Sequence, residues 1–150
     1  MDNVFFFDVN LKWEHNHLAE LASTKVNHTI KVSTAAEFSK EMPGKWTAEH
    51  LFLGSLCSCY MSAFLLLAEN SGLKFKSFGC DALGRVEKHH DVLSFTEIIL
   101  KPVVKIFKST DQEKANRLLE KAEVNCIIAN SIKTQIQRFV VIKVAEEHVE

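Results

Sequence analysis

Apolar and polar residues alternate along two stretches near the N-terminus, which is the pattern of half-buried β-strands. A polar cluster at 14–17 separates the first stretch from a second one that runs from Lys25 to Val32. Such a pattern predicts two or three antiparallel strands. The apolar positions of the first stretch are Phe5, Phe7, Val9, Leu11 and Trp13.

The segment after Gly44 is apolar at nearly every position. Thr47 is a candidate N-cap, and Glu49 falls in the first helical turn, where a carboxylate is favoured. No charged residue occurs from Leu51 to Ala68, and Gly72 is a candidate terminator. The pattern predicts one long helix, and a helix that is apolar all round needs cover on every side.

Eighteen uncharged residues are also long enough to cross a bilayer. Three serines, two cysteines and a glycine reduce the hydrophobicity of this segment, and no basic cluster flanks it. We therefore predict a helix buried at the centre of a homodimer, and no membrane partner.

The second half of the chain predicts a hairpin, two helices and a final strand. The hairpin strands span 74–88 and 92–106, with a polar turn between them. After Ser109 or Thr110 a helix is expected, then a short helix near 127–132 and a strand at 139–144. The order predicts an α+β fold with mainly antiparallel strands, in a single domain that covers residues 1–150. The apolar face of the longer helix consists of Ala115, Leu118, Leu119 and Ala122.

Charge and cysteine content narrow the functional classes. Eighteen basic residues against nineteen acidic ones give a net charge of -1, which supplies no long-range attraction for nucleic acid. The first ten residues contain two aspartates and no basic group, so we expect a cytoplasmic protein. Four cysteines in a reducing compartment favour free thiols, either buried in the core or redox-active.

Helical geometry separates the chemically active side chains of the long helix. Glu49 and Cys59 are ten residues apart, about 280° around a straight helix, so they meet only if the helix bends near Gly54 and Ser55. Cys57 and Cys59 project about 200° apart, so they do not line one site.

Two segments resemble signatures of the OsmC/Ohr family, the osmotically inducible and organic hydroperoxide resistance proteins. TAEHLFLGSLCSCYMSAF is similar to the family's first signature, and EKAEVNCIIANSI is similar to its second. The resemblance implies antiparallel sheets around a long buried central helix, in an intertwined homodimer with its sites at the subunit interface.

The resemblance also implies a thiol peroxidase of the oxidative stress response. Cys59 would attack an organic hydroperoxide, Cys126 would resolve the sulfenic acid to a disulfide, and Glu49 would orient a cationic group. A dithiol reductant, such as a lipoylated protein, would restore the thiols, with no metal, flavin or other cofactor. Apolar residues expected to line the pocket are Phe52, Leu56 and Phe64.

The family's activating arginine comes from the N-terminal strands, where this sequence has none. Lys12 or His17 is the candidate substitute, although neither offers the planar fork of a guanidinium. The three arginines, Arg85, Arg117 and Arg138, lie elsewhere in the sequence.

The missing arginine leaves a second class of function open. An OsmC-like dimer could bind a small apolar ligand with weak or no peroxidase activity, and a purely structural dimer would have neither ligand nor reactive thiol. The histidines, with His15 and His17 on one strand face, lack the spacing typical of metal sites, so we expect exposed side chains there and no metal. Cys80, in a strand pattern, is expected in the core.

Overall fold

The computed structural model describes residues 3–40 and 43–145. These residues divide into two compact units, with the boundary between Phe52 and Leu53. The boundary falls inside the long helix α1 (Ala48–Ser71). We describe each unit by itself.

The N-terminal unit is a four-stranded sheet in the order β1-β2-β3-β4. Its first three strands pair antiparallel, as the alternating pattern predicts, whereas β4 joins β3 in parallel. The first strand begins only at Asn10, because residues 3–9 have no partner strand despite their alternation. The strands are β1 (Asn10–His15), β2 (Leu18–Ala22), β3 (Ile30–Ser33) and β4 (Trp46–Thr47).

Both ends of α1 are capped by the residues that the sequence indicates. The hydroxyl of Thr47 accepts a hydrogen bond from the backbone N–H of His50 at 3.3 Å. At the other end Gly72 has a φ of 74°, and the N–H of Leu73 donates to the carbonyl of Ala68 at 3.0 Å. This is a Schellman cap, which glycine permits at little cost. The helix continues without interruption through Gly54 and Ser55, where the sequence offered a break.

The C-terminal unit contains the predicted hairpin. Its turn residues His90 and Asp91 have φ values of 51° and 65°, the left-handed conformation of a two-residue type I′ turn. Two short strands replace the single final strand expected at 139–144, and both run parallel to β6, so the mainly antiparallel prediction fails here. The strands of this sheet are β5 (Phe75–His89), β6 (Val92–Ile106), β7 (Ile136–Arg138) and β8 (Val141–Val144).

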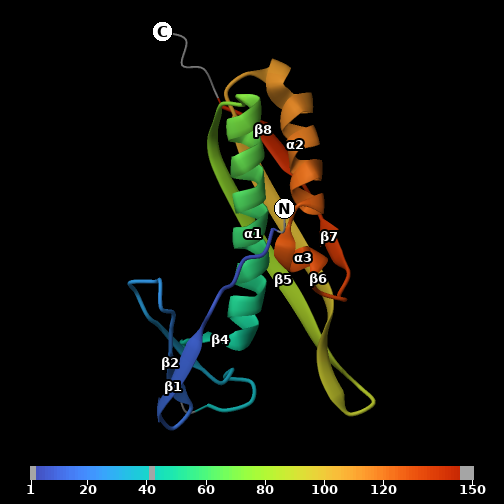
Figure 1. The fold of residues 1–150 in the computed structure, drawn as a ribbon. Helices are drawn as coiled ribbons and strands as arrows, with labels where there is room; N and C mark the ends of the chain where they lie inside the picture. The colour runs from blue at the N-terminus through green and yellow to red at the C-terminus, as the bar shows by residue number, and fades with distance from the viewer. Residues whose placement is uncertain (1–2, 41–42, 146–150) are drawn as a thin grey trace. The chain divides into compact units, whose positions relative to one another are not determined.

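The two longer helices lie side by side on one face of this sheet (Figure 1). A 3-10 turn (Ser109–Asp111) leads into α2 (Gln112–Val124), and α3 (Ile127–Asn130) follows. The predicted apolar face of α2 is buried and forms the core together with α1 and β6. Within the single chain α1 buries one face, which consists of Leu56, Tyr60, Ala63, Phe64 and Ala68.

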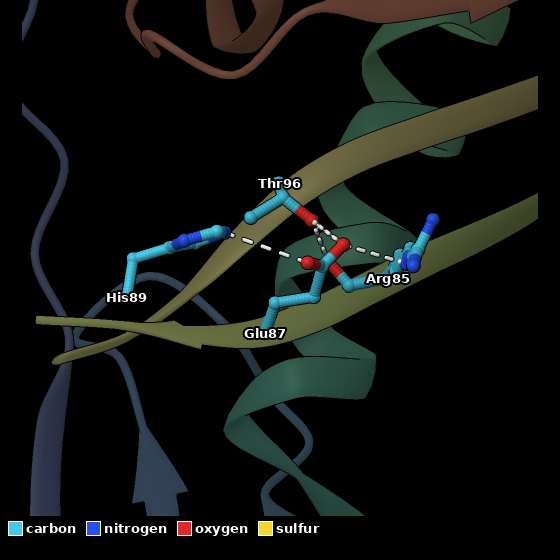
Figure 2. A network of polar contacts seen from close by, with 4 residues as sticks. All are labelled: Arg85, Glu87, His89 and Thr96. Atoms are coloured by element: carbon cyan, nitrogen blue, oxygen red, sulfur yellow. Dashed lines mark hydrogen bonds and ion pairs between the residues drawn. The ribbon is translucent and has the colours of Figure 1, made fainter. Parts of the chain in front are cut away.

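A polar cluster holds the outer part of the hairpin (Figure 2). The carboxylate of Glu87 pairs with the Arg85 guanidinium at 2.6 Å and with the His89 ring at 3.4 Å. It also accepts a hydrogen bond from the hydroxyl of Thr96 at 2.9 Å. Residues 3–40 and 43–145 contain no group of three His, Cys, Asp or Glu side chains placed to hold a metal ion.

Gly84 is a close-packed position of β5 that tests the helix–sheet packing. A Cβ there would lie 2.5 Å from the ring of Phe95 and 3.0 Å from Leu53. We expect Gly84→Ala to lower the free energy of unfolding by about 1–3 kcal/mol in urea titrations, as overpacking does. Gly79→Ala in the same strand, where a Cβ meets nothing within 4 Å, is the matched control and should cost less than about 0.5 kcal/mol. Equal effects of the two substitutions would contradict this packing.

Candidate functional site

Cys59 and Cys126 lie in contact within the C-terminal unit. Cys59 projects from the middle of α1, and Cys126 lies between α2 and α3, immediately before Ile127. The two thiols lie close enough to affect each other's ionisation. Cys126 is fully buried, whereas Cys59 is only partly buried. The pair therefore contains one accessible thiol, Cys59, and one covered thiol, Cys126.

The surroundings of Cys126 favour its protonated form. Burial raises the pKa of the Cys126 thiol, and the contact with Cys59 adds to this effect. The backbone of Ala129 and the positive charge of Arg138 act in the opposite direction. Because burial dominates, Cys126 carries its proton at neutral pH and can supply it during a reaction.

A largely buried cation, Arg138, lies beside the thiol pair. The Arg138 side chain is 14% exposed, and its guanidinium carbon lies 5.7 Å from the centre of the Tyr60 ring. Its Nε atom is 3.6 Å from a carboxylate oxygen of Glu123, an ion pair that is too long for a hydrogen bond. That Nε is buried and has no hydrogen-bond partner among the described residues. Arg138 therefore has a donor available to an anionic group at this site.

Arg138 lies far along the chain from the N-terminal strands, where the resemblance places the activating arginine. Parallel pairing of β7 with β6 places Arg138 opposite Leu100, a fully buried residue of β6. The burial of Arg138 results from tertiary structure, because β7 pairs with a strand that is distant in the sequence. One feature of the sequence could have indicated a role for this residue: Arg138 is a charged residue that directly precedes the apolar run Phe139–Ile142.

Tyr60 fixes the position of the arginine. Its hydroxyl donates a hydrogen bond to the backbone carbonyl of Leu119 at 3.0 Å, which ties α1 to α2. Burial, and then the negative charge of Glu123, raise the pKa of Tyr60 well above its usual value. The phenol stays protonated, and its ring provides a rigid surface for the guanidinium.

Glu49 and His17 belong to the N-terminal unit and line one cavity of about 440 Å³. The His17 ring is hydrogen-bonded to the hydroxyl of Thr34 at 2.8 Å. Lys12 lies on β1 opposite Glu20 of β2. The apolar part of the cavity is formed by Leu11, Ala19, Leu21, Val32, Ala35 and Leu51.

The three residues predicted to line a pocket have different positions. Leu56 and Phe64 are fully buried, and the Phe64 ring stacks on Phe78 of β5 with 5.4 Å between ring centres. Phe64 thus lies on the face of α1 that is turned toward the sheet. Phe52 is partly buried and ends the N-terminal unit. Their role as pocket residues stays a prediction.

The chain thus combines an α+β fold of two sheets and a long apolar helix with two cysteines in contact. A family model described as OsmC-like protein matches residues 39–138. The chain therefore belongs to the OsmC-like family, and the resemblance inferred from the two sequence segments is confirmed.

Relatives and solved structures agree with this assignment. An uncharacterized protein of Bacillus subtilis, YmaD, is 25% identical over 142 residues, which cover 91% of each chain. An OsmC-like protein of unknown function from Vibrio cholerae has a TM-score of 0.83 at 19% identity, over 92% of this chain and 100% of the other. An organic hydroperoxide resistance protein from Elizabethkingia anophelis has a TM-score of 0.74 at 16% identity, over 97% and 100%.

Helix α1 is long and apolar enough to cross a membrane, with a mean hydropathy of 1.9. One such helix is weak evidence for a span, because the core helix of a soluble protein passes the same test. In the OsmC-like fold this segment is the core helix.

The charge of Arg138 should be measurable at Cys126. Because this charge lowers the pKa of Cys126, Arg138→Met should raise that pKa, so that alkylation of Cys126 becomes slower at any given pH. The measurement is the pH profile of iodoacetamide alkylation in a variant with the other cysteines replaced by alanine. Arg138→Lys should preserve most of the effect, and Arg117→Met, at an exposed position of α2, should leave the profile unchanged. An unchanged profile in Arg138→Met would exclude the electrostatic contact.

Proposed function

We propose that this protein is an organic hydroperoxide reductase in which Cys59 attacks the peroxide and Cys126 resolves the product. The contact between the two thiols carries this proposal. Their difference in exposure supports the division of roles, since a peroxide reaches the partly buried Cys59 more readily than the covered Cys126. Organic hydroperoxide resistance proteins among the structural neighbours are consistent with this chemistry.

The reaction proceeds in two balanced steps. The Cys59 thiolate attacks the terminal oxygen of ROOH, the O–O bond breaks, and the leaving alkoxide takes a proton to become ROH. Cys59 is then a sulfenic acid. The Cys126 sulfur attacks that sulfur, the S–O bond breaks, and the proton of Cys126 leaves with the hydroxide as water.

Arg138 provides the positive charge for this site in the proposed mechanism. Its buried Nε–H can donate to the negative charge that develops on sulfur or on the leaving oxygen. The Glu123 carboxylate and the Tyr60 ring both contact the guanidinium and help to position it. In the N-terminal unit, Glu49 orients a second cationic group, for which His17, in the same cavity, is a better placed candidate than Lys12.

Apolar side chains around Cys59 would favour the binding of organic hydroperoxides over that of hydrogen peroxide. A dithiol, free or as a lipoylated protein, attacks the Cys59–Cys126 disulfide and restores both thiols. Such a cycle requires neither a metal nor an organic cofactor, and we expect it to operate in the cytoplasm.

One equivalent of cumene hydroperoxide should convert the reduced protein into a form with a Cys59–Cys126 disulfide, identified by mass spectrometry of tryptic peptides. Cys126→Ser should stop at a Cys59 sulfenic acid that dimedone traps, and Cys59→Ser should lose peroxide consumption. Arg138→Met should slow the reaction about tenfold or more, equivalent to about 1.4 kcal/mol of lost charge stabilisation, while Arg117→Met should not. Intact Cys59 and Cys126 thiols after this exposure would exclude the peroxidase.

The second candidate function is binding of a small apolar ligand with weak or no turnover. The cavity of about 440 Å³ in the N-terminal unit, with its largely apolar lining, favours it. A lipid that copurifies with the protein, together with thiols that do not react with peroxide, is the outcome that would select this function.

We also propose a homodimer. Large apolar side chains remain exposed on the single chain, among them Leu66 of α1, which is 61% exposed. Large apolar side chains exposed on a long helix favour a partner that covers them, and a second copy presents the same helix.

Light scattering should give twice the 17.0 kDa mass of one chain. Leu66→Glu should shift the mass toward the monomer, because a buried unpaired charge destabilises an interface. Leu66→Met, which keeps the apolar volume, is the matched control and should remain dimeric. A monomeric protein at micromolar concentration would contradict the homodimer.

A further inference from the structure

A second pair of cysteines lies on the other side of α1. The thiols of Cys57 in the helix and Cys80 in β5 lie close enough to affect each other's ionisation, and the Cys80 thiol also donates a hydrogen bond to the backbone carbonyl of Asp81 at 3.8 Å. Both side chains are partly buried. The peroxide reaction proposed above uses neither of them.

Contacts between α1 and β5 place this pair in a regular series. The rings of Phe64 and Tyr60 lie 5.4 and 6.2 Å from the ring of Phe78, and nearer the helix N-terminus Leu53 lies beside Gly84. Residue numbers therefore fall along the helix as they rise along the strand. The cysteine pair falls between the contact at Phe78 and the contact at Gly84, so the packing of the two elements holds the thiols opposite each other.

Helical periodicity keeps the two cysteine pairs apart. Position 57 lies on the same face as positions 60 and 64, which pack against β5. Position 59 projects about 200° away, toward Cys126. Each pair can therefore react without exchange between Cys57 and Cys59.

The surroundings of the pair favour a disulfide over a bound metal. Burial raises the pKa of Cys57, and it raises the pKa of Cys80 to about 12, with the nearby charge of Asp81 adding to both effects. A metal requires both sulfurs as thiolates at once. Oxidation requires only one thiolate at a time. Cys57 provides it, because its pKa is raised less than the pKa of Cys80.

We propose that Cys57 and Cys80 are a second redox couple, which excess organic hydroperoxide converts to a disulfide that ties α1 to β5. The Cys57 thiolate attacks the terminal peroxide oxygen, the O–O bond breaks, and ROH leaves. Cys80 then attacks the sulfenic sulfur, the S–S bond forms, and water leaves with the proton of Cys80. The two thiols lose two electrons, and one ROOH is reduced to ROH and water.

This couple is slow in both directions. Its thiols are protonated at neutral pH, so it reacts after Cys59 has been oxidised. Reduction by attack on Cys57 expels Cys80, whose high pKa makes it a poor leaving group. The disulfide would thus persist during sustained oxidation and hold the central helix on its sheet, on the face away from Cys59.

The test uses Cys59→Ala/Cys126→Ala, which removes the first pair and makes the outcome independent of the proposed peroxidase. Tenfold excess cumene hydroperoxide should consume both remaining thiols, and tryptic mapping should recover Cys57 linked to Cys80. The unfolding midpoint should rise by about 5 °C or more, since the bond closes a loop that the unfolded chain otherwise leaves open. In the same background Cys80→Ala should give a dimedone adduct on Cys57 and no rise.

Wild-type protein provides a second measurement if the double variant does not fold. Trypsin cuts after Lys76 and Arg85, and after Lys121 and Lys133, so Cys80 and Cys126 fall in different peptides. Excess peroxide should link both peptides to the one that carries Cys57 and Cys59. Absence of the Cys80 link, a link between subunits, or a crosslink without a higher midpoint would overturn the proposal.

Discussion

The long apolar helix α1 must be covered by other parts of the protein, and the rest of the structure depends on this requirement. A helix without a polar face loses stability wherever water reaches it. One face is buried against the sheet and α2 through Leu56, Tyr60, Phe64 and neighbouring small residues. Side chains such as Leu66 remain exposed on the other faces, and this exposure is what the proposed homodimer would cover.

The same helix carries Cys57 and Cys59, one cysteine of each thiol pair. Two cysteines separated by one residue must point to opposite sides, and each side offers a different partner. Cys126, between α2 and α3, lies beside Cys59 on one side, near the guanidinium of Arg138 from β7, and Cys80 of β5 lies beside Cys57 on the other side. Tyr60 lies between the two sites, packs against Phe78, and ties α1 to α2 through Leu119. A single helix thus positions two thiol pairs on opposite sides.

Arg138 is a cation close to the Cys59–Cys126 pair that the sequence did not predict. Arg138 lies on β7, is largely buried, and contacts Tyr60 and Glu123; in the proposed mechanism it supplies positive charge to the thiol pair. Since its Nε–H has no hydrogen-bond partner among the described residues, the arginine has a donor for a reacting group. The peroxidase proposal therefore has a source of positive charge within the C-terminal unit.

Local pattern in the sequence determined the long helix, its caps at Thr47 and Gly72, the hairpin and the buried face of α2, because each depends on neighbours within a few residues. The spacing of Cys57 and Cys59 likewise determined that they cannot share a site. Tertiary structure decided which thiol meets which, since Cys59–Cys126 and Cys57–Cys80 are contacts between distant segments. It also decided the parallel strands β7 and β8 and the burial of Arg138, because pairing across the sheet leaves no periodic signal in the sequence.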